Sequence, residues 1–229
     1  RHLRVACFSH VAWLAADDPD RARRELERGI GISSSKMFDF SQLWLSGARR
    51  DIALYSGEGL EEAGPIPEGW RRAARALDRF PQAGLILSFF SRARRRIALA
   101  EAAATPAAAL AHLEHVDGHV RELERQRTPW GDALALLVRA GASATRGLRE
   151  RAISEAEQAE SSLGAVDMAL FAAAARRGRG ELTGGDAGHA LVAEADAWMA
   201  GQSIRRPERM ARMLAPGAWG RAAVTSRRT

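Results

Sequence analysis

The chain has 229 residues, of which 46% are hydrophobic and 27% are charged. This balance is typical of a folded domain and excludes a chain that is disordered throughout. No apolar run approaches the ~20 residues that a membrane-spanning helix needs, so we expect no membrane partner. The single cysteine, Cys7, cannot form an internal disulfide, which is typical of a reducing, cytoplasmic compartment.

The net charge of +6 is explained better by codon bias than by nucleic-acid binding. Lys36 is the only lysine and asparagine is absent, as expected when a GC-rich genome biases its codons. The basic residues are interleaved with 28 acidic ones, and runs such as Arg94-Arg95-Arg96 lack the aromatic side chains on which bases stack. We therefore predict a solvated basic surface rather than a nucleic-acid partner.

Helix signals recur along the chain, whereas alternating strand patterns and hairpin turns are nearly absent. Asp18, Thr105 and Thr128 each place a side-chain oxygen before a proline, which is the pattern of a helix N-cap followed by the first helical position. In chain order, the pattern predicts helices at about 2–16, 19–30, 36–55, 58–79, 82–104, 106–126, 129–146, 148–163, 165–179 and 186–201.

These helices fall into five pairs, and the second helices share a spacing typical of tetratricopeptide-like repeats. In each set, a small residue is followed four positions later by an apolar or small residue, and three positions after that by a third residue of the same kind. The small residues let the paired helix approach closely. The sets are Ala22/Leu26/Gly29, Ala73/Leu77/Phe80, Ala109/Leu113/Val116 and Ala152/Ala156/Ala159, while the fifth, Ala187/Leu191, breaks down at Glu194. The sequence therefore predicts an all-α fold, an α-α superhelix (a tetratricopeptide-like solenoid) of about five helix pairs, in a single domain over residues 1–217.

A short helix that begins at Pro207 is predicted to cap this array. Met210, Met213 and Leu214 lie at positions i, i+3 and i+4 and therefore share one face. Because the last repeat of a stacked array leaves its apolar face uncovered, we expect this helix to cover the final pair and to form no part of a binding site. Residues 218–229 are expected to form a disordered, arginine-rich tail.

The predicted helix over 106–126 carries the sharpest group of potential metal ligands. His112, His115 and His119 lie within one sector of the helix, and histidine pairs at such spacing can bind zinc. An apolar stripe runs beside them, so the histidines are expected to be exposed and to lack residues that would orient their rings. We predict solvated histidines, no metal and no cofactor.

No motif for phosphoryl transfer is present in the chain. The glycine-rich stretch over 178–185 follows a helix rather than a strand and lacks the Gly-Lys-Ser/Thr of a phosphate loop. Lys36 has no glycine-rich turn before it, and His-Arg-Asp, Asp-Phe-Gly and Ala-Pro-Glu segments are absent. We therefore predict that the chain is not an enzyme.

Several segments carry a family resemblance. They are Asp51–Gly57 with Gly69-Trp70-Arg, Arg92-Ala-Arg94 with Ile97–Ala100, Thr128–Leu134, Asp167–Phe171 leading to Arg176-Arg177, and the close from Gly184–Gly188 through Ala197-Trp-Met199 to Arg206-Pro and Arg209–Gly217. Together, over about residues 40–217, they resemble the C-terminal helical-repeat region of large multidomain bacterial serine/threonine protein kinases. The resemblance implies kinase activity for a parent protein and a repeat scaffold for sensing or docking here. No catalytic residue carries over.

The sequence leaves two main functions open. The first is a non-catalytic, monomeric scaffold for protein–protein interaction in signal transduction, with a concave surface that binds an acidic or phosphorylated peptide. Bidentate contacts would come from arginines on or near the first helices: Arg49, Arg50, Arg92, Arg95, Arg139 and Arg176. The alternative is the ligand-sensing helical region of a large bacterial transcription regulator. A deep apolar pocket with convergent polar groups would favour the alternative, whereas a broad, shallow basic groove would favour docking.

Overall fold

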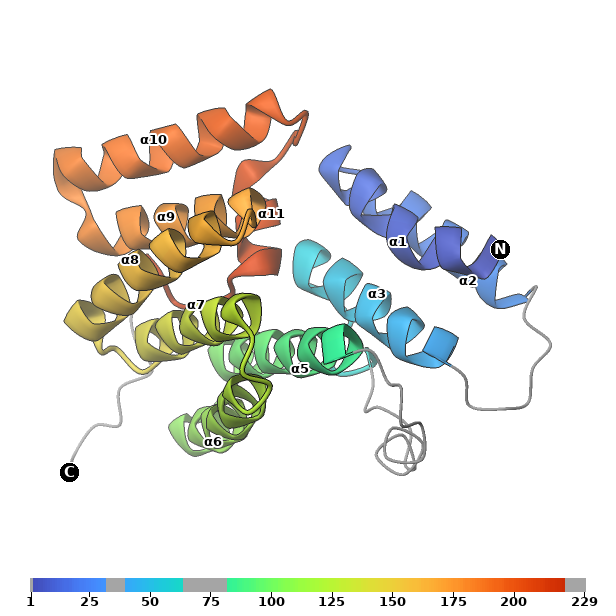
Figure 1. The fold of residues 1–229 in the computed structure, drawn as a ribbon, viewed down its shortest axis with the longest axis horizontal. Coiled ribbons are helices and arrows are strands. Elements are labelled where there is room, and N and C mark those ends of the chain that lie inside the picture. Colours follow the sequence, from blue (N-terminus) through green and yellow to red (C-terminus); the bar gives the residue numbers. More distant parts are fainter. Residues whose placement is uncertain (1, 32–39, 64–81, 221–229) are drawn as a thin grey trace.

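The protein is all-helical over residues 2–31, 40–63 and 82–220, the part of the chain that the computed structural model describes (Figure 1). Within these ranges there is no strand, and the helices are α1 (His2–Ala15), α2 (Pro19–Gly31), α3 (Phe40–Ser56), α5 (Gln82–Ala102), α6 (Pro106–Glu124), α7 (Pro129–Thr145), α8 (Arg149–Ala165), α9 (Ala169–Thr183), α10 (Gly185–Gly201) and α11 (Pro207–Leu214). The all-α prediction is confirmed. Among these helices, none combines the length and the apolar content that crossing a bilayer requires.

Side-chain caps begin three of the helices at the predicted places. Asp18, Thr105 and Thr128 each accept a hydrogen bond from the backbone N–H three residues later, at 2.9, 3.2 and 3.2 Å. Each cap satisfies an N–H group that the first helical turn leaves without a partner. The proline that follows costs nothing, because its missing N–H falls at a position that makes no intrahelical bond.

Helices that follow one another in the sequence pack against one another. α1 packs on α2, α5 on α6, α7 on α8 and α9 on α10, while α3 contacts both α1 and α5, and α5 also contacts α7. The small-residue spacing is buried as predicted on α2, α6 and α8: Ala22, Leu26, Ala109, Leu113, Val116, Ala152, Ala156 and Ala159 are each at most 3% exposed. The set that begins at Ala73 lies outside the described residues. In the fifth set, which breaks down at Glu194, Ala187 is exposed and Leu191 is half-buried.

The helix predicted over 58–79 does not begin at residue 58. Residues 58–63 form irregular turns, and the rest of the predicted helix lies outside the described residues. Gly57 and Gly59 adopt φ angles of 75° and 69°, a left-handed conformation that glycine reaches without a Cβ clash. The two glycines therefore end α3 and prevent a new helix from starting at once.

The prediction that residues 207–214 cover the final helix pair is confirmed, but α9 and α10 are not the only neighbours of this helix among the described residues. α11 packs against α3 and α9 as well as α10, so it lies between the N-terminal and the C-terminal helices (Figure 1). Its apolar face is buried as predicted, since Met210, Met213 and Leu214 are each at most 5% exposed. A short amphipathic helix carries no local signal of every neighbour it will meet, which is why the contact with α3 was not predicted.

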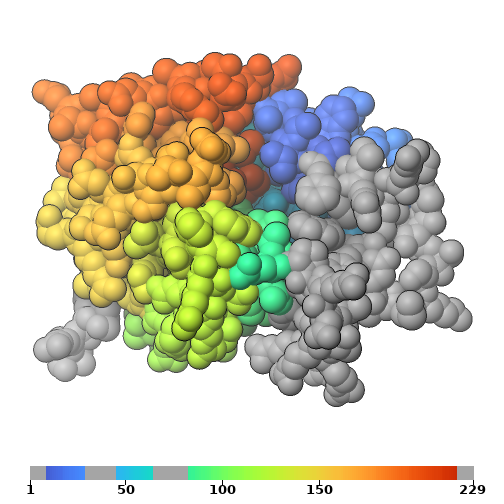
Figure 2. Space-filling view, in the orientation of Figure 1, coloured from blue at the N-terminus to red at the C-terminus, as the bar shows by residue number. Residues whose placement is uncertain are grey.

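The C-terminal segment, residues 204–219, reaches the N-terminal helices directly. The Arg205 N–H donates a hydrogen bond to the Ala15 carbonyl oxygen at the end of α1, at 2.9 Å. Arg94 of α5 donates to the Met213 carbonyl oxygen, also at 2.9 Å. In Figure 2 the blue N-terminal helices accordingly lie against the orange-red C-terminal part of the chain. The segment thus ties together helices that are far apart in the sequence.

Glycines on α7 and α9 make room for the C-terminal segment. A Cβ atom at Gly141 would lie 2.2 Å from the Pro216 carbonyl oxygen, and one at Gly178 would lie 2.8 Å from the Trp219 ring. Trp219 is only 6% exposed, so the packed chain extends beyond the domain end predicted at residue 217. Ala218 and Trp219 therefore belong to the packed chain, and residues 221–229 of the predicted tail lie outside the described residues.

Gly141→Ala should lower the free energy of unfolding by roughly 1–3 kcal/mol, because the added methyl group must displace a backbone carbonyl. Gly164→Ala in α8 is the matched control, since its Cβ would have nothing within 4 Å. There the better helix propensity of alanine should raise the stability by up to about 1 kcal/mol. Urea denaturation measures both changes, and a Gly141→Ala variant as stable as Gly164→Ala would contradict the close contact.

Candidate functional site

The six arginines predicted to bind a partner are spread over four helices: Arg49 and Arg50 on α3, Arg92 and Arg95 on α5, Arg139 on α7 and Arg176 on α9. Three of them already pair with acidic residues of the chain. Arg95 lies 3.5 Å from Glu61, Arg176 lies 2.7 Å from Glu160, and Arg139 pairs with Glu124. A docking partner would have to displace these carboxylates.

The other three predicted arginines differ in their surroundings. Arg49 is exposed, and the Arg92 guanidinium lies 5.8 Å from the centre of the Phe89 ring. Arg50 is only 1% exposed, so it cannot contact a partner at the surface. Its Nε donates to Ser91 Oγ at 2.8 Å and its Nη2 to Ser46 Oγ at 3.3 Å. The prediction of Arg50 as a surface-docking residue is therefore corrected.

Two of the α6 histidines, His112 and His119, contact side chains that do not bind metals. Arg96 donates a hydrogen bond to His112 Nδ1 at 2.9 Å, and burial together with the Arg96 charge lowers the pKa of His112. His119 stacks obliquely near Phe89, with ring centres 6.1 Å apart. Over the described ranges, no three His, Cys, Asp or Glu side chains come together in a way that could hold a metal.

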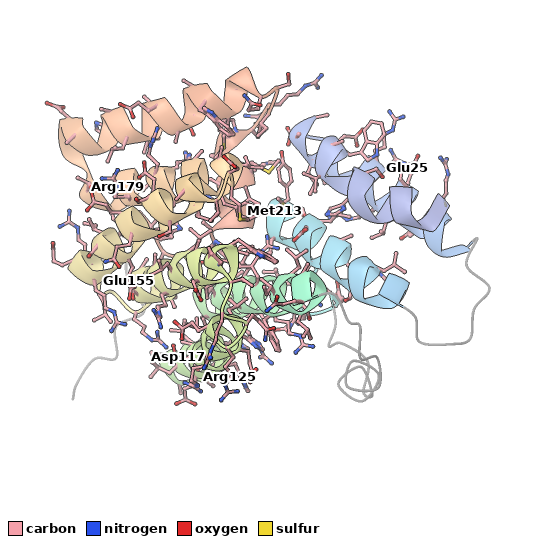
Figure 3. The ribbon with its side chains drawn as sticks, in the orientation of Figure 1. Glu25, Asp117, Arg125, Glu155, Arg179 and Met213 are labelled. Atoms are coloured by element: carbon pink, nitrogen blue, oxygen red, sulfur yellow. The ribbon has the colours of Figure 1, made fainter. Side chains whose placement is uncertain are left out.

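A mainly apolar cavity of about 260 Å³ opens where five helices converge. Its apolar wall is formed by Leu170 and Phe171 of α9 and by Met213 and Leu214 of α11, with Val11 of α1. Met213, labelled in Figure 3, lies where α11 faces the N-terminal helices. The cavity therefore exists only because the C-terminal segment lies inside the array, and its wall includes residues that the sequence assigned to a cap.

The cavity is also lined by a buried ionic cluster on α1, α3 and α5. Arg94 Nη2 donates to Asp51 Oδ1 at 2.7 Å, and His10 Nε2 lies 3.1 Å from Asp51 Oδ2. Burial raises the pKa of Asp51, but the attraction of Arg94 and the hydrogen bond with His10 outweigh burial and leave that pKa below its ordinary value. Asp51 is therefore a carboxylate at neutral pH.

Arg50 adds a second cation to this cluster. Burial lowers the pKa of Arg50 to about 10, an effect that the Asp51 charge opposes and the Arg94 charge reinforces. Arg50 nevertheless stays protonated at pH 7. Within the described residues, no carboxylate lies within ion-pair distance of its guanidinium. The cluster thus carries two buried arginines and one carboxylate, which pairs with Arg94 and not with Arg50.

Three residues that line the cavity each carry a buried polar atom with no hydrogen-bond partner among the described residues. The atoms are His10 Nδ1, Ser88 Oγ and Arg94 Nε, and each residue is at most 5% exposed. Buried polar groups nearly always have partners, because an unsatisfied one costs roughly 1–3 kcal/mol. Three such residues therefore lie around one cavity.

Gly47 of α3 also lines the cavity, and a Cβ atom at this position would have nothing within 4 Å. A larger side chain at residue 47 therefore has open space to enter. Substitution of Gly47 by a larger residue should therefore fill the cavity without displacing the backbone.

A second depression, of about 440 Å³, lies between α2 and α3 and includes Arg49. It is larger but more open, and its Arg23 already pairs with Asp20 at 2.7 Å and with Glu58 at 3.9 Å. Shallow, charged depressions of this kind are common on surfaces, whereas enclosed apolar cavities with convergent polar groups are typical of ligand sites. We therefore place the candidate site at the 260 Å³ cavity.

The comparisons with protein-family models, with curated proteins and with solved structures find no match for this chain. The resemblance to the repeat region of bacterial kinases consequently stays a prediction. The function must be argued from the cavity itself.

Sequence reasoning missed the residues of this cluster, His10, Asp51, Ser88 and Arg94. The available signal was polar and small side chains on otherwise apolar helical faces, as at Ser88 beside Phe89 and Phe90. Such a pattern also fits ordinary helix packing, so it becomes informative only once the helices are placed together.

Proposed function

We propose that the chain is a small-molecule-binding sensory module of tetratricopeptide-like superhelical form. This is the second of the two functions that the sequence left open, the ligand-sensing region of a larger regulatory protein. The observation that carries it is the cavity, which joins an apolar wall to three buried, unpartnered polar atoms. Known small-molecule sites share this combination of apolar lining and a few convergent polar groups.

The size of the cavity supports a small ligand. An engineered apolar cavity of ~150 Å³ already binds benzene. The present cavity of about 260 Å³ therefore has room for a short-chain or single-ring molecule. Peptides and nucleic acids would need a longer groove, so the cavity favours a metabolite over a macromolecule.

A ligand in the cavity would act on the C-terminal segment. Met213 and Leu214 belong both to the cavity wall and to α11, and Arg94 binds the Met213 carbonyl oxygen. A ligand that binds only the assembled cavity stabilises that assembly, by about 2.7 kcal/mol at a hundredfold excess over Kd. Binding would thus hold α11 against α3, α5 and α9, and this change of stability is a signal that a parent protein can use.

The docking function has less support. Three of its six predicted arginines are paired with acidic side chains, and Arg50 is buried. The signalling context, the parent kinase and the cytoplasmic location stay predictions from the sequence.

Titration calorimetry with two slender probes, 1-octanol and octanoate, tests the proposed function. We expect at least one probe to bind wild type at a single site. Binding should disappear in Gly47→Leu, whose new side chain enters the cavity, and persist in Gly164→Leu, a helical glycine in α8 that also faces open space. The proposal is wrong if neither probe binds wild type, or if Gly47→Leu binds as tightly as wild type.

A further inference from the structure

The charges on the cavity wall do not balance. Arg50 and Arg94 are both at most 5% exposed, while Asp51 supplies the only negative charge among the described residues that line the cavity. The buried cluster therefore carries an excess of one positive charge when His10 is neutral. A buried charge without a partner is strongly unfavourable, so proteins pair such charges with an opposite one.

The unpartnered donors lie on the same wall as the excess charge. Arg94 Nη2 donates a hydrogen bond to Asp51, and Arg94 Nη1 donates one to the Met213 carbonyl oxygen. The Arg94 Nε–H has no acceptor among the described residues. The Ser88 hydroxyl, on the same face of α5, is also unpartnered and buried. Two free donors beside an excess cation form a site for an oxygen anion, because hydrogen bonds to a charged acceptor are about twice as strong as neutral ones.

Among the described residues, the side chains that α9 and α11 contribute to the cavity are all apolar. They are Leu170, Phe171, Met213 and Leu214. These side chains and the ionic cluster together match a molecule with an anionic group at one end and an apolar body at the other. The single excess charge matches a monoanion, which favours a carboxylate over a phosphate ester that carries nearly two charges at neutral pH.

We propose that the ligand of the cavity is a small apolar carboxylic acid, bound as its anion. Its carboxylate lies against Ser88, Arg94 and Arg50, and its apolar part lies against α9 and α11. This inference rests on the proposed function and specifies the chemical class of the ligand. The acid donates no proton to the protein, and no bond is formed or broken.

The affinities of octanoate and 1-octanol, which share one apolar chain and differ in the charged end, test this inference. At pH 7.5, wild type should bind octanoate roughly tenfold or more tighter than 1-octanol, the ratio expected from one or two charge-assisted hydrogen bonds. The ratio should fall to about one in Arg50→Met and persist in Arg49→Met, the exposed neighbour on the same helix. Arg50→Lys, which keeps the charge, should restore most of the preference.

Ser88→Ala provides a second readout, because it removes one donor without changing the charge. It should weaken octanoate binding several-fold and leave 1-octanol binding unchanged. Thermal unfolding without ligand tests whether Arg50 serves the stability of the protein or the binding of the ligand. Because Arg50→Met removes a buried charge that has no counter-charge, its unfolding temperature should be no lower than that of wild type.

Equal binding of the two probes to wild type would overturn the carboxylate assignment and leave the proposed function intact. A full octanoate preference in folded Arg50→Met would overturn it as well. If Arg50→Met does not fold, Ser88→Ala decides, and an unchanged preference in that variant contradicts the inference. Failure of both probes to bind would instead reject the proposed function.

Discussion

Truncation after Ser203 should destabilise helices at both ends of the array rather than the final pair alone. The deletion removes Met210, Met213 and Leu214, which are at most 5% exposed. Burial of each such side chain contributes roughly 1.5–3 kcal/mol, and the total stability of a domain is only about 5–15 kcal/mol. We therefore expect partial unfolding under conditions in which the full chain is stable.

The polar contacts of the C-terminal segment indicate which helices will lose protection from amide hydrogen exchange in the truncated variant. Arg206 and Arg209 lie 3.3 and 3.2 Å from Asp17, in the turn between α1 and α2. Tyr55 at the end of α3 donates a hydrogen bond to the same carboxylate at 2.9 Å. Amide hydrogen exchange should consequently rise in α3 and α5 as much as in α9.

A truncation after Gly220 is the control for the deletion, since it removes only residues 221–229 and keeps the C-terminal segment. Its exchange pattern should match that of the full chain. Faster exchange confined to α9 and α10 in the longer deletion would contradict the structure and support the simple cap that the sequence suggested.

Asp51→Ala should be the most damaging single substitution of the ionic cluster. It removes the one carboxylate that Arg94 binds at 2.7 Å, and leaves two buried guanidinium groups without a counter-charge. Breaking a buried ion pair by removing one partner costs about 3–5 kcal/mol. Glu25→Ala is the matched control, because the Glu25–Arg28 pair is on the surface of α2, where Arg28 is 72% exposed (Figure 3). That change should cost no more than about 0.5 kcal/mol.

The Asp51 contribution also has a defined pH dependence. The folded-state pKa of Asp51 lies below 3.8, the value in the unfolded chain, because Arg94 and His10 outweigh the effect of burial. The carboxylate therefore contributes its full stability above about pH 3.8, and this contribution is lost as the pH falls through the lower folded-state pKa. Urea denaturation of wild type and Asp51→Asn should show a gap in the free energy of unfolding that shrinks as the pH falls below 3.8. A gap that stays unchanged below pH 3.8 would contradict this assignment.

The helices were predictable because their signals are local. The caps at Thr105 and Thr128 and the buried spacing at Ala109 and Ala152 need only a few neighbouring residues, and the structure reproduces them. The error over residues 58–63 has a local origin as well. The sequence predicts a new helix from residue 58, but Gly57 and Gly59 adopt positive φ angles in an irregular turn.

The candidate site was not predictable from the same signals. The contact between Arg94 and the Met213 carbonyl oxygen joins residues 119 positions apart, and no periodicity reports such a pairing. Arg50 illustrates the consequence. Its neighbour Arg49 is exposed, and a sequence pattern alone cannot say that Arg50 is buried against Ser91. The cavity depends on where the C-terminal segment lies, which only the assembled helices determine.

The position of a bound probe gives the most direct test of a ligand site between α5 and α11. Methyl NMR of the protein labelled at the methionine methyl groups reports on Met213, which lines the cavity, and on Met199, which is buried on α10 away from it. Saturating octanoate should shift the Met213 methyl resonance and leave that of Met199 in place, and Gly47→Leu should abolish the Met213 shift. A Met213 resonance that stays unchanged at saturation, or that shifts equally in Gly47→Leu, would contradict a binding site in this cavity.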